Sequence, residues 1–350
     1  MTISVEMSRC LIIGCLVVLI SQLQAQPSES IDHKIRLLKA PDDADSSYIM
    51  RYIRGNDIRL IYGGQGSNIS YGSMNEGDAL FDDALYHNVN DLGGFGLTYK
   101  FIDFDLTFSL KNVNALEDER QNLSQFRLAY SYTMRKFAVR AYFSDAKGVI
   151  VEQTKGSTKS DPDVHLVKVG AQVTYYLNNR QYSYRAANFQ NELQRKTAGS
   201  LLVRAEPFYR SLGMHEPLIP EDIALYGQQA GLEYVRTGGL MVMPGYGYNL
   251  AIGGGKFFVS PIVFLGPGVT VNVYKAADAK HTFMNVEWAG SFALNAGYNG
   301  PKFYATFRTI YDVGYFNLDP SYFTTSDLKI TLTVGWRFNH FETFIPTTLF

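Results

Sequence analysis

The sequence predicts an all-β fold, a transmembrane antiparallel up-and-down β-barrel. Three observations predict it: strand-like segments that alternate apolar and polar residues, an N-terminal export signal, and a composition rich in Tyr, Phe and Gly. The alternation is clearest in residues 328–338, where apolar residues are interleaved with Lys329, Thr331, Thr333, Gly335 and Arg337. A period of two gives a strand one apolar and one polar face, as required of a wall between lipid and water.

The N-terminus predicts a secretory signal peptide over residues 1–25. Arg9 precedes the apolar run 11–20, and a polar stretch ends at the small residue Ala25, after which we expect cleavage. The run is too short to cross a bilayer as a helix. A lipoprotein box around Cys15 is the alternative, but it would leave too few apolar residues before the cleavage point. Both cysteines lie within the signal, so we expect no disulfide and no thiol chemistry in the mature chain.

The remaining chain divides into three predicted parts. Residues 26–56 are polar and without period, which indicates an extended or disordered periplasmic lead-in. Residues 57–341 form the predicted outer-membrane barrel, and residues 342–350 are a C-terminal tail. The net charge of −1 gives no argument for nucleic-acid binding.

The barrel is predicted to have twelve strands, because tight and long connections alternate along the chain and both ends should lie in the periplasm. Fourteen strands are the alternative, since residues 177–197 stand where a short turn belongs but are too long for one. We interpret them as an extended turn or an inward-folded segment. The twelve predicted strands are 58–73, 93–101, 103–111, 125–133, 137–144, 164–176, 198–210, 240–252, 257–273, 285–298, 302–313 and 328–338.

Residues 182–200, Y-S-Y-R-A-A-N-F-Q-N-E-L-Q-R-K-T-A-G-S, resemble a signature block of the DUF4421 family. The resemblance extends over about residues 50–341. It implies an exported β-barrel of Gram-negative bacteria and supplies no catalytic residues. In the block, Arg185, Glu192, Arg195 and Lys196 are candidates for plugging the barrel or binding a partner; a structured periplasmic turn is the simpler interpretation.

Alternation assigns a basic face to the lumen, because Arg or Lys on the lipid face costs about 2–4 kcal/mol at the midplane. Four acids share this face: Asp105, Glu206, Glu287 and Asp312. Lys111, Arg210 and Lys329 add to its bases. The candidate binding residues are Lys100, Arg127, Arg140, Lys168, Arg204, Arg308 and Arg337.

A basic lumen favours a passive channel or binder for small anionic solutes. The alternative is a closed structural or interaction barrel, in which bases pair with acids and partners meet the loops, notably 145–163 and 211–239, or the segment 177–197. An outer-membrane enzyme is a third hypothesis. Its best candidate, His165 near Asp161 and Asp163, is a weak constellation, and we expect no catalysis, metal or cofactor. Membrane lipid is the predicted partner; no protein partner is specified.

Overall fold

The structure, a computed structural model, describes most of the predicted barrel. The described residues are 38–39, 43–73, 84–110, 123–152, 158–213, 231–276, 279–317 and 321–338. The predicted signal peptide and C-terminal tail lie outside them. The described residues from 39 to 338 form one structural unit.

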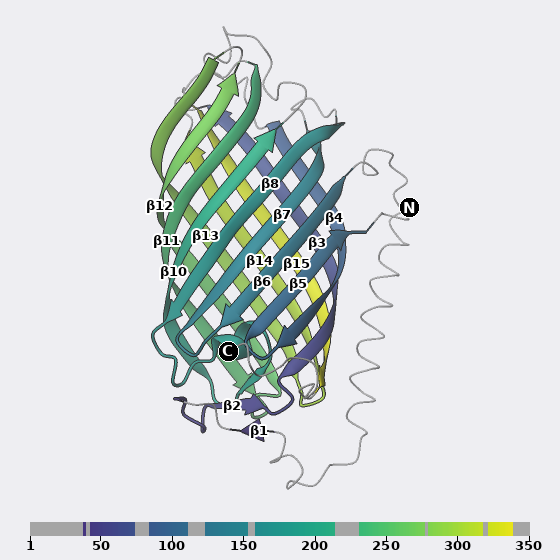
Figure 1. The fold of residues 1–350 in the computed structure, drawn as a ribbon, viewed down its shortest axis with the longest axis vertical. Coiled ribbons are helices and arrows are strands. Elements are labelled where there is room, and N and C mark those ends of the chain that lie inside the picture. Colours follow the sequence, from purple (N-terminus) through teal and green to yellow (C-terminus); the bar gives the residue numbers. More distant parts are fainter. Residues whose placement is uncertain are drawn as a thin grey trace, which may run out of the picture. The chain divides into compact units, whose positions relative to one another are not determined.

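Twelve antiparallel strands close into a barrel, so the predicted number is confirmed and the fourteen-strand alternative is wrong (Figure 1). The ring closes where the first and last strands, β3 and β15, pair over Asn56–Ser73 and Ser321–Phe338. The other strands are β4 (Ala84–Tyr99), β5 (Ile102–Ser109), β6 (Ser124–Thr133), β7 (Phe137–Glu152), β8 (Thr158–Tyr176), β10 (Ala198–Gly213), β11 (Leu232–Ile252), β12 (Phe257–Ala276), β13 (Ala279–Asn299) and β14 (Phe303–Asn317).

Several strands extend beyond their predicted ends, and the largest extensions are toward the long connections. β12 and β13 stay in register up to the pair Ala276–Ala279, although residues 274–284 were expected to form a loop. Likewise β7 and β8 continue into the predicted loop 145–163, and β11 begins within the predicted loop 211–239. The reason is that backbone pairing continues where the apolar alternation stops, so hydrophobic pattern alone ends a strand too early.

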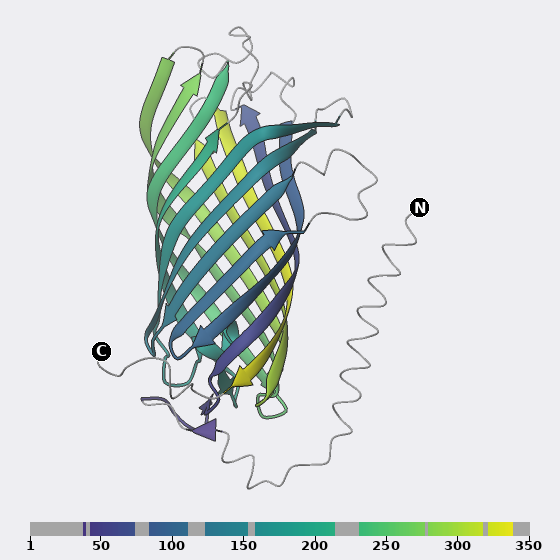
Figure 2. The same cartoon turned by 45° about the vertical axis from the view of Figure 1, so that its right-hand side comes forward.

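The wall is uneven around the hairpin of β5 and β6, which is shorter than its neighbours. Beyond its end β4 and β7 pair directly, at Leu85–Glu152 through His87–Ile150. A register shift between Lys147 and Val149 accompanies this change, and Gly148 between them has a φ of +78°. A bulge of this kind bends one strand and lets it change partner. Figure 2 shows how the long, tilted strands wrap around the ring.

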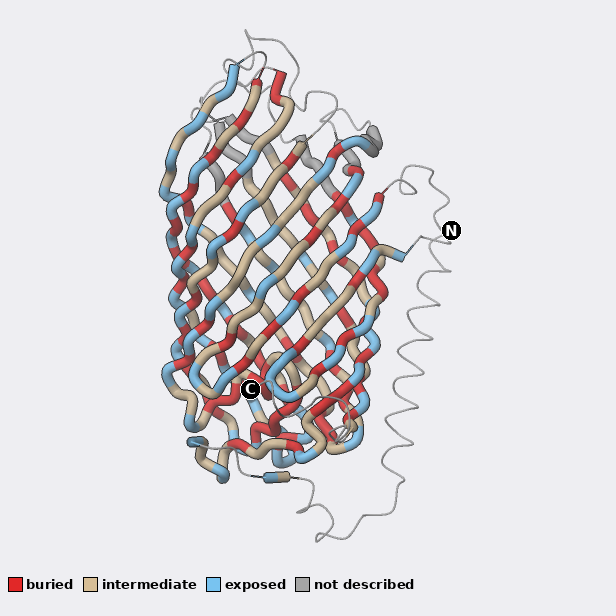
Figure 3. Tube along the Cα trace, in the orientation of Figure 1, coloured by how far each residue is buried: buried red, intermediate tan, exposed pale blue. Residues whose placement is uncertain are grey.

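The outward face of the barrel is apolar and the inward face is largely polar. Leu201 and Trp288 are 60% and 59% exposed, and the predicted outward residues Phe126, Tyr130 and Phe307 are exposed as well. Figure 3 shows the alternation of buried and exposed positions along each strand. No helix in the described ranges has the length and apolar character needed to cross a membrane.

One inward surface is apolar instead. Leu202 and Phe208 of β10, Met241 and Met243 of β11 and Phe264 of β12 form a buried cluster inside the barrel. Large apolar residues inside a lumen need something to pack against. The segment between β8 and β10 provides it.

Candidate functional site

Residues 177–197, here called the plug, fold into the barrel and contain α3 (Tyr184–Asn188) and β9 (Glu192–Gln194). Ser183 begins the helix, since its hydroxyl accepts a hydrogen bond from the backbone N–H of Ala186 at 2.9 Å. Gln190 follows the helix with a φ of +57°, which turns the chain toward β9. β9 then pairs antiparallel with β2 (Ile49–Tyr52), and β1 (Leu38–Lys39) belongs to the same separate sheet. Of the two sequence interpretations, the inward-folded segment is correct.

The plug reaches all around the end of the barrel that carries the tight turns, at the bottom of Figure 1. Arg185 donates to the backbone oxygen of Lys100 in the β4–β5 turn at 2.8 Å. Arg135, in the β6–β7 turn, donates to the backbone oxygen of Asn179 at 2.7 Å. Across the ring, Asn299 donates to the backbone oxygen of Glu192 at 2.8 Å. These contacts place the plug across the mouth of the barrel.

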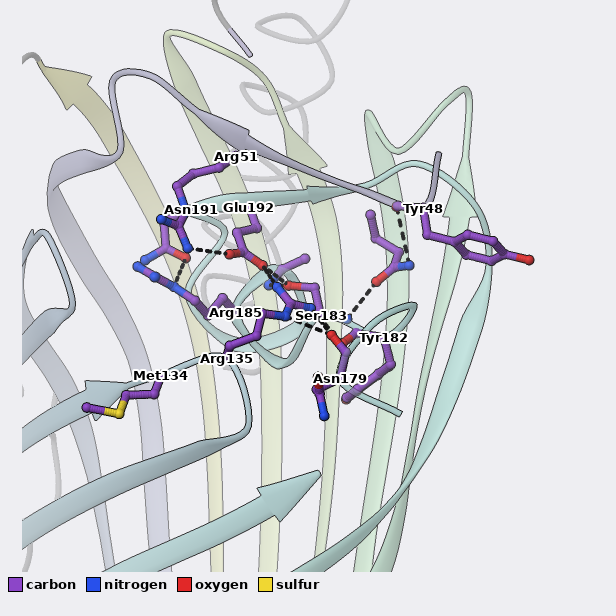
Figure 4. Close-up of polar contacts among 12 residues, drawn as sticks. Tyr48, Arg51, Met134, Arg135, Asn179, Tyr182, Ser183, Arg185, Asn191 and Glu192 are labelled. Atoms are coloured by element: carbon purple, nitrogen blue, oxygen red, sulfur yellow. Dashed lines mark hydrogen bonds and ion pairs between the residues drawn. The ribbon is translucent and has the colours of Figure 1, made fainter. Parts of the chain in front are cut away.

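Glu192 is the electrostatic centre of the plug and is completely buried (Figure 4). Its carboxylate accepts hydrogen bonds from the guanidinium groups of Arg51 at 3.2 Å and Arg135 at 3.1 Å and from the Ser183 hydroxyl at 2.5 Å. Burial by itself would raise the pKa of Glu192, but the charges of Arg185, Arg135 and Arg51 and the bond from Ser183 outweigh it, so the pKa is lowered. Glu192 is therefore ionised at neutral pH. Because the arginines come from the lead-in and a barrel turn, the carboxylate joins the plug to both.

β2 lies in the predicted lead-in, so residues 49–52 are extended, as one of the two expectations has it, and pair as a strand. Met50 pairs with Leu193 of the plug. The hydroxyl of Tyr52 donates to the backbone oxygen of Asn299 at 2.6 Å. Four residues are too few for an alternation pattern to reveal a strand, and the partner strand lies more than 140 residues away along the chain.

The plug also has an apolar side, which fills the internal cluster. Tyr182 and Ala187 have no exposed surface and pack with Leu202 and Phe264. Tyr184 stacks on Tyr176 of β8 with ring centroids 5.2 Å apart. Burying an apolar side chain of this size stabilises a fold by about 1.5–3 kcal/mol.

Above the plug, the opposite side of the lumen is charged and encloses a cavity of about 40 Å³. Asn188, Phe189 and Gln190 of the plug form part of its lining. Bases from four strands line it, namely Arg59 of β3, Arg140 of β7, Arg308 of β14 and Lys329 of β15. Arg308 donates to the backbone and side-chain oxygens of Asn188 at 3.0 and 2.9 Å, so this lumen base holds the plug directly.

A compact ion cluster around Arg59 forms another part of the lining, to which Asp103 and Asp105 also belong. The guanidinium of Arg59 donates to Asp103 and Asp105 at 2.6 Å each and to Asp57 at 3.2 Å. The sequence reasoning missed Arg59, Asp57 and Asp103. The signal was present, because 57 and 59 on one strand and 103 and 105 on a nearby strand are alternate positions and share one face.

A protein-family model described as a domain of unknown function, DUF4421, matches residues 43–338. The chain belongs to the DUF4421 family. This confirms the resemblance seen in residues 182–200, and the match includes β2, the plug and the whole barrel of this DUF4421 protein.

No curated protein matches the chain. Among solved structures, the outer membrane protease OmpT from Escherichia coli is 9% identical with a TM-score of 0.37, over 83% of this chain and 97% of that one. The translocator domain of the autotransporter NalP from Neisseria meningitidis is 11% identical with a TM-score of 0.31, over 88% and 95%. The toluene transporter TodX from Pseudomonas putida is 9% identical with a TM-score of 0.30, over 85% and 90%. Such identities and scores carry no information on activity.

The predicted lumen bases of the DUF4421 barrel lie in different environments. Arg308 and Arg337 hold the plug, the latter by donating to the backbone oxygen of Gln190 and to Asn299. Lys168 forms an ion pair with Asp327 at 2.6 Å, and the guanidinium of Arg204 lies 3.7 Å from the centre of the Phe264 ring. Arg127 and Arg140 are half-buried.

Lys100 does not occupy the expected lumen position. It lies in the tight β4–β5 turn with a φ of +56° and an exposed side chain, because the strand ends one residue earlier. Within the plug, Arg185 and Glu192 are buried, whereas Arg195 and Lys196 are exposed. The Nζ atom of Lys196 lies 5.1 Å from the centre of the Tyr48 ring.

The excess of bases in the lumen is smaller than alternation predicts, because three further carboxylates point inward. Asp57 and Asp103 surround Arg59, and Asp327 pairs with Lys168. Part of the positive charge of the lumen is therefore balanced by carboxylates of the barrel itself.

Over the described ranges, no group of three or more His, Cys, Asp or Glu residues could hold a metal ion. His165 contacts Asp145 across β7 and β8 at an exposed position.

Proposed function

We propose that this DUF4421 protein is an outer-membrane barrel that binds small anionic solutes in its lumen and passes them only when the plug moves. Export and membrane insertion are supported by the N-terminal signal pattern and by the apolar outer face with its polar interior. The plug, held by hydrogen bonds around the ring, makes a binder or gated path a better fit than a permanently open pore.

The observation that carries the anion preference is the imbalance of charges above the plug. Arg59 and Lys168 each have carboxylate partners at ion-pair distance. Among the residues that the structure describes, Arg308 in contrast donates only to the neutral groups of Asn188 and Asn295. Uncompensated cations within low-dielectric walls attract anions and repel cations.

The test is single-channel conductance and reversal potential of the refolded mature chain, residues 26–350, in a planar bilayer. The wild type is expected to be silent or to open rarely, and Glu192→Gln, which weakens the plug, is expected to conduct with anion selectivity. Changing Arg127, Arg140 and Arg308 together to Ala in the Glu192→Gln background should reduce that selectivity. Cation selectivity of the loosened barrel would contradict the proposal.

A closed structural barrel is the second candidate, favoured by the density of internal pairs. The hydroxyl of Tyr304 donates to Asp57 at 2.7 Å, which extends the Arg59 cluster past β15 to β14. Under this candidate, the folded barrel stays silent with Glu192→Gln as well.

A further inference from the structure

Three bases from different parts of the ring converge on the cavity above the plug. Arg308 and Lys329 are diagonal neighbours on β14 and β15, since Arg308 pairs with Thr331. Arg140 comes from β7, which lies on the opposite side of the twelve-strand ring. All three line the same cavity of about 40 Å³. Convergence from opposite walls makes this a site rather than a row of solvated charges.

Two carboxylates, Asp103 and Asp105, line the same cavity, but Arg59 binds both of them at 2.6 Å. Within the part of the chain that the structure describes, neither Arg140 nor Lys329 makes a hydrogen bond or an ion pair. Asp105, which interacts electrostatically with both, is already held by Arg59 at 2.6 and 2.9 Å. Arg308 uses its Nε and Nη2 atoms on the amide oxygens of Asn295 and Asn188. Three neighbouring positive charges are costly in a confined space, and an anion would relieve that cost.

We propose that this cavity binds one oxyanion group, an inorganic phosphate or sulfate or the phosphoryl end of a small solute, through Arg140, Arg308 and Lys329. The proposal rests on the anion-binding function above and specifies its site. A guanidinium fork matches the geometry of an oxyanion, and the ammonium group of a lysine adds a compact charge. The volume suits one charged group, so any remainder of a solute would extend up the lumen.

The site is complete only while the plug is seated. Asn188 lines the cavity and also accepts two hydrogen bonds from Arg308, which orient that guanidinium. A ligand that binds the seated state better than the open state stabilises it by the same free energy. Bound oxyanion therefore strengthens closure, and opening the plug releases the oxyanion into the periplasm.

The test is isothermal titration of inorganic phosphate into the folded mature chain in detergent micelles. Arg140→Gln and Lys329→Gln should each weaken binding roughly tenfold or more, as expected for a lost hydrogen bond to a charged group. Lys256→Gln is the matched control, because it removes one exposed positive charge in the β11–β12 turn at the same end of the barrel. Gel mobility before and after heating checks that each variant folds.

Asn188→Ala provides an independent measurement, since it changes no charge. It should weaken phosphate binding severalfold if plug seating orients Arg308, whereas a diffuse positive field would leave the affinity unchanged. Two further titrations distinguish a free inorganic ion from the phosphoryl end of a small solute: sulfate represents the inorganic ion, and glycerol 3-phosphate represents the ester. Equal affinities for phosphate and glycerol 3-phosphate would indicate an inorganic ion, and tighter binding of the ester would indicate the end of a larger solute.

Phosphate binding that is absent, or equal in the wild type and in both charge variants, would overturn the proposed site. If the plug-loosened barrel were still anion selective in that case, the general function would stand and only this site would be lost. If neither phosphate binding nor anion selectivity were found, both proposals would fail.

Discussion

The plug meets two very different sides of the lumen. On the side of β10–β12, Tyr182 and Ala187 pack into a dry cluster with Leu202 and Phe264. On the side of β14 and β15, Asn188 and Gln190 accept hydrogen bonds from Arg308 and Arg337. Apolar packing depends on close fit and little on conditions, while the charged side responds to pH, salt and ligand. The comparison indicates an anchored edge and a releasable edge of one segment.

The largest effect is expected from Glu192→Ala, which removes the buried carboxylate that joins the plug to Arg51 and Arg135. Three arginines would be left without their buried carboxylate, and breaking a buried charge cluster costs about 3–5 kcal/mol. Hydrogen exchange of the α3 amides, read by mass spectrometry, measures the free energy of plug opening. Glu233→Ala is the control, because its pair with Lys275 is more than a third exposed and worth at most about 1 kcal/mol. Equal exchange in both variants would show that Glu192 does not hold the plug.

Leu202→Ala tests the anchored edge. Leu202 is 1% exposed and its truncation should destabilise the plug by about 2–5 kcal/mol through a cavity. Leu201→Ala is the matched control on the same strand, since Leu201 is 60% exposed on the outer face. Faster α3 exchange in Leu202→Ala alone is the expected outcome; the same change in both would mean that the barrel wall, not the plug contact, is weakened.

Arg308→Gln is expected to have a smaller effect on plug opening. It removes two hydrogen bonds to Asn188 from a charged donor, and the net loss should be about 1.5–3 kcal/mol because the Gln amide can replace one of them. Arg308→Lys retains the positive charge but not the planar guanidinium, so it separates the effect of the charge from the effect of the guanidinium geometry. If Lys restored the wild-type exchange rate, the fork geometry of arginine would be unnecessary there.

The smallest effect is the dependence of closure on pH. The pKa of Glu192 is lowered from its ordinary value of 4.5, so its stabilisation of the plug is complete above that value. It is lost progressively as the pH falls below 4.5 toward the lowered pKa. Conductance of the wild type should therefore increase only in acid, and Glu192→Gln should abolish this dependence. An unchanged acid response in Glu192→Gln would assign it to another group.

The inward or outward direction of residues within strands was predictable, because the alternation along each strand assigns its residues to two faces. Phe126 and Tyr130 alternate with Arg127, and the structure exposes both aromatic rings. Residues 57 and 103 were missed because they fall at strand edges, where the alternation has few neighbours to support it. The internal cluster around Met241 and Met243 was missed for a different reason, since apolar residues inside a barrel look like lipid-facing ones.

By itself the sequence determined the barrel, its twelve strands and the segment that breaks the pattern, because alternation and turn spacing are local properties of the chain. Only the tertiary structure decided that residues 177–197 fold inward and that Glu192 meets Arg51 and Arg135. These partners are 141 and 57 residues away along the chain. A period of two tells which side a residue faces, but not its height in the ring or which opposite strand it meets. Those follow only from closure of the barrel.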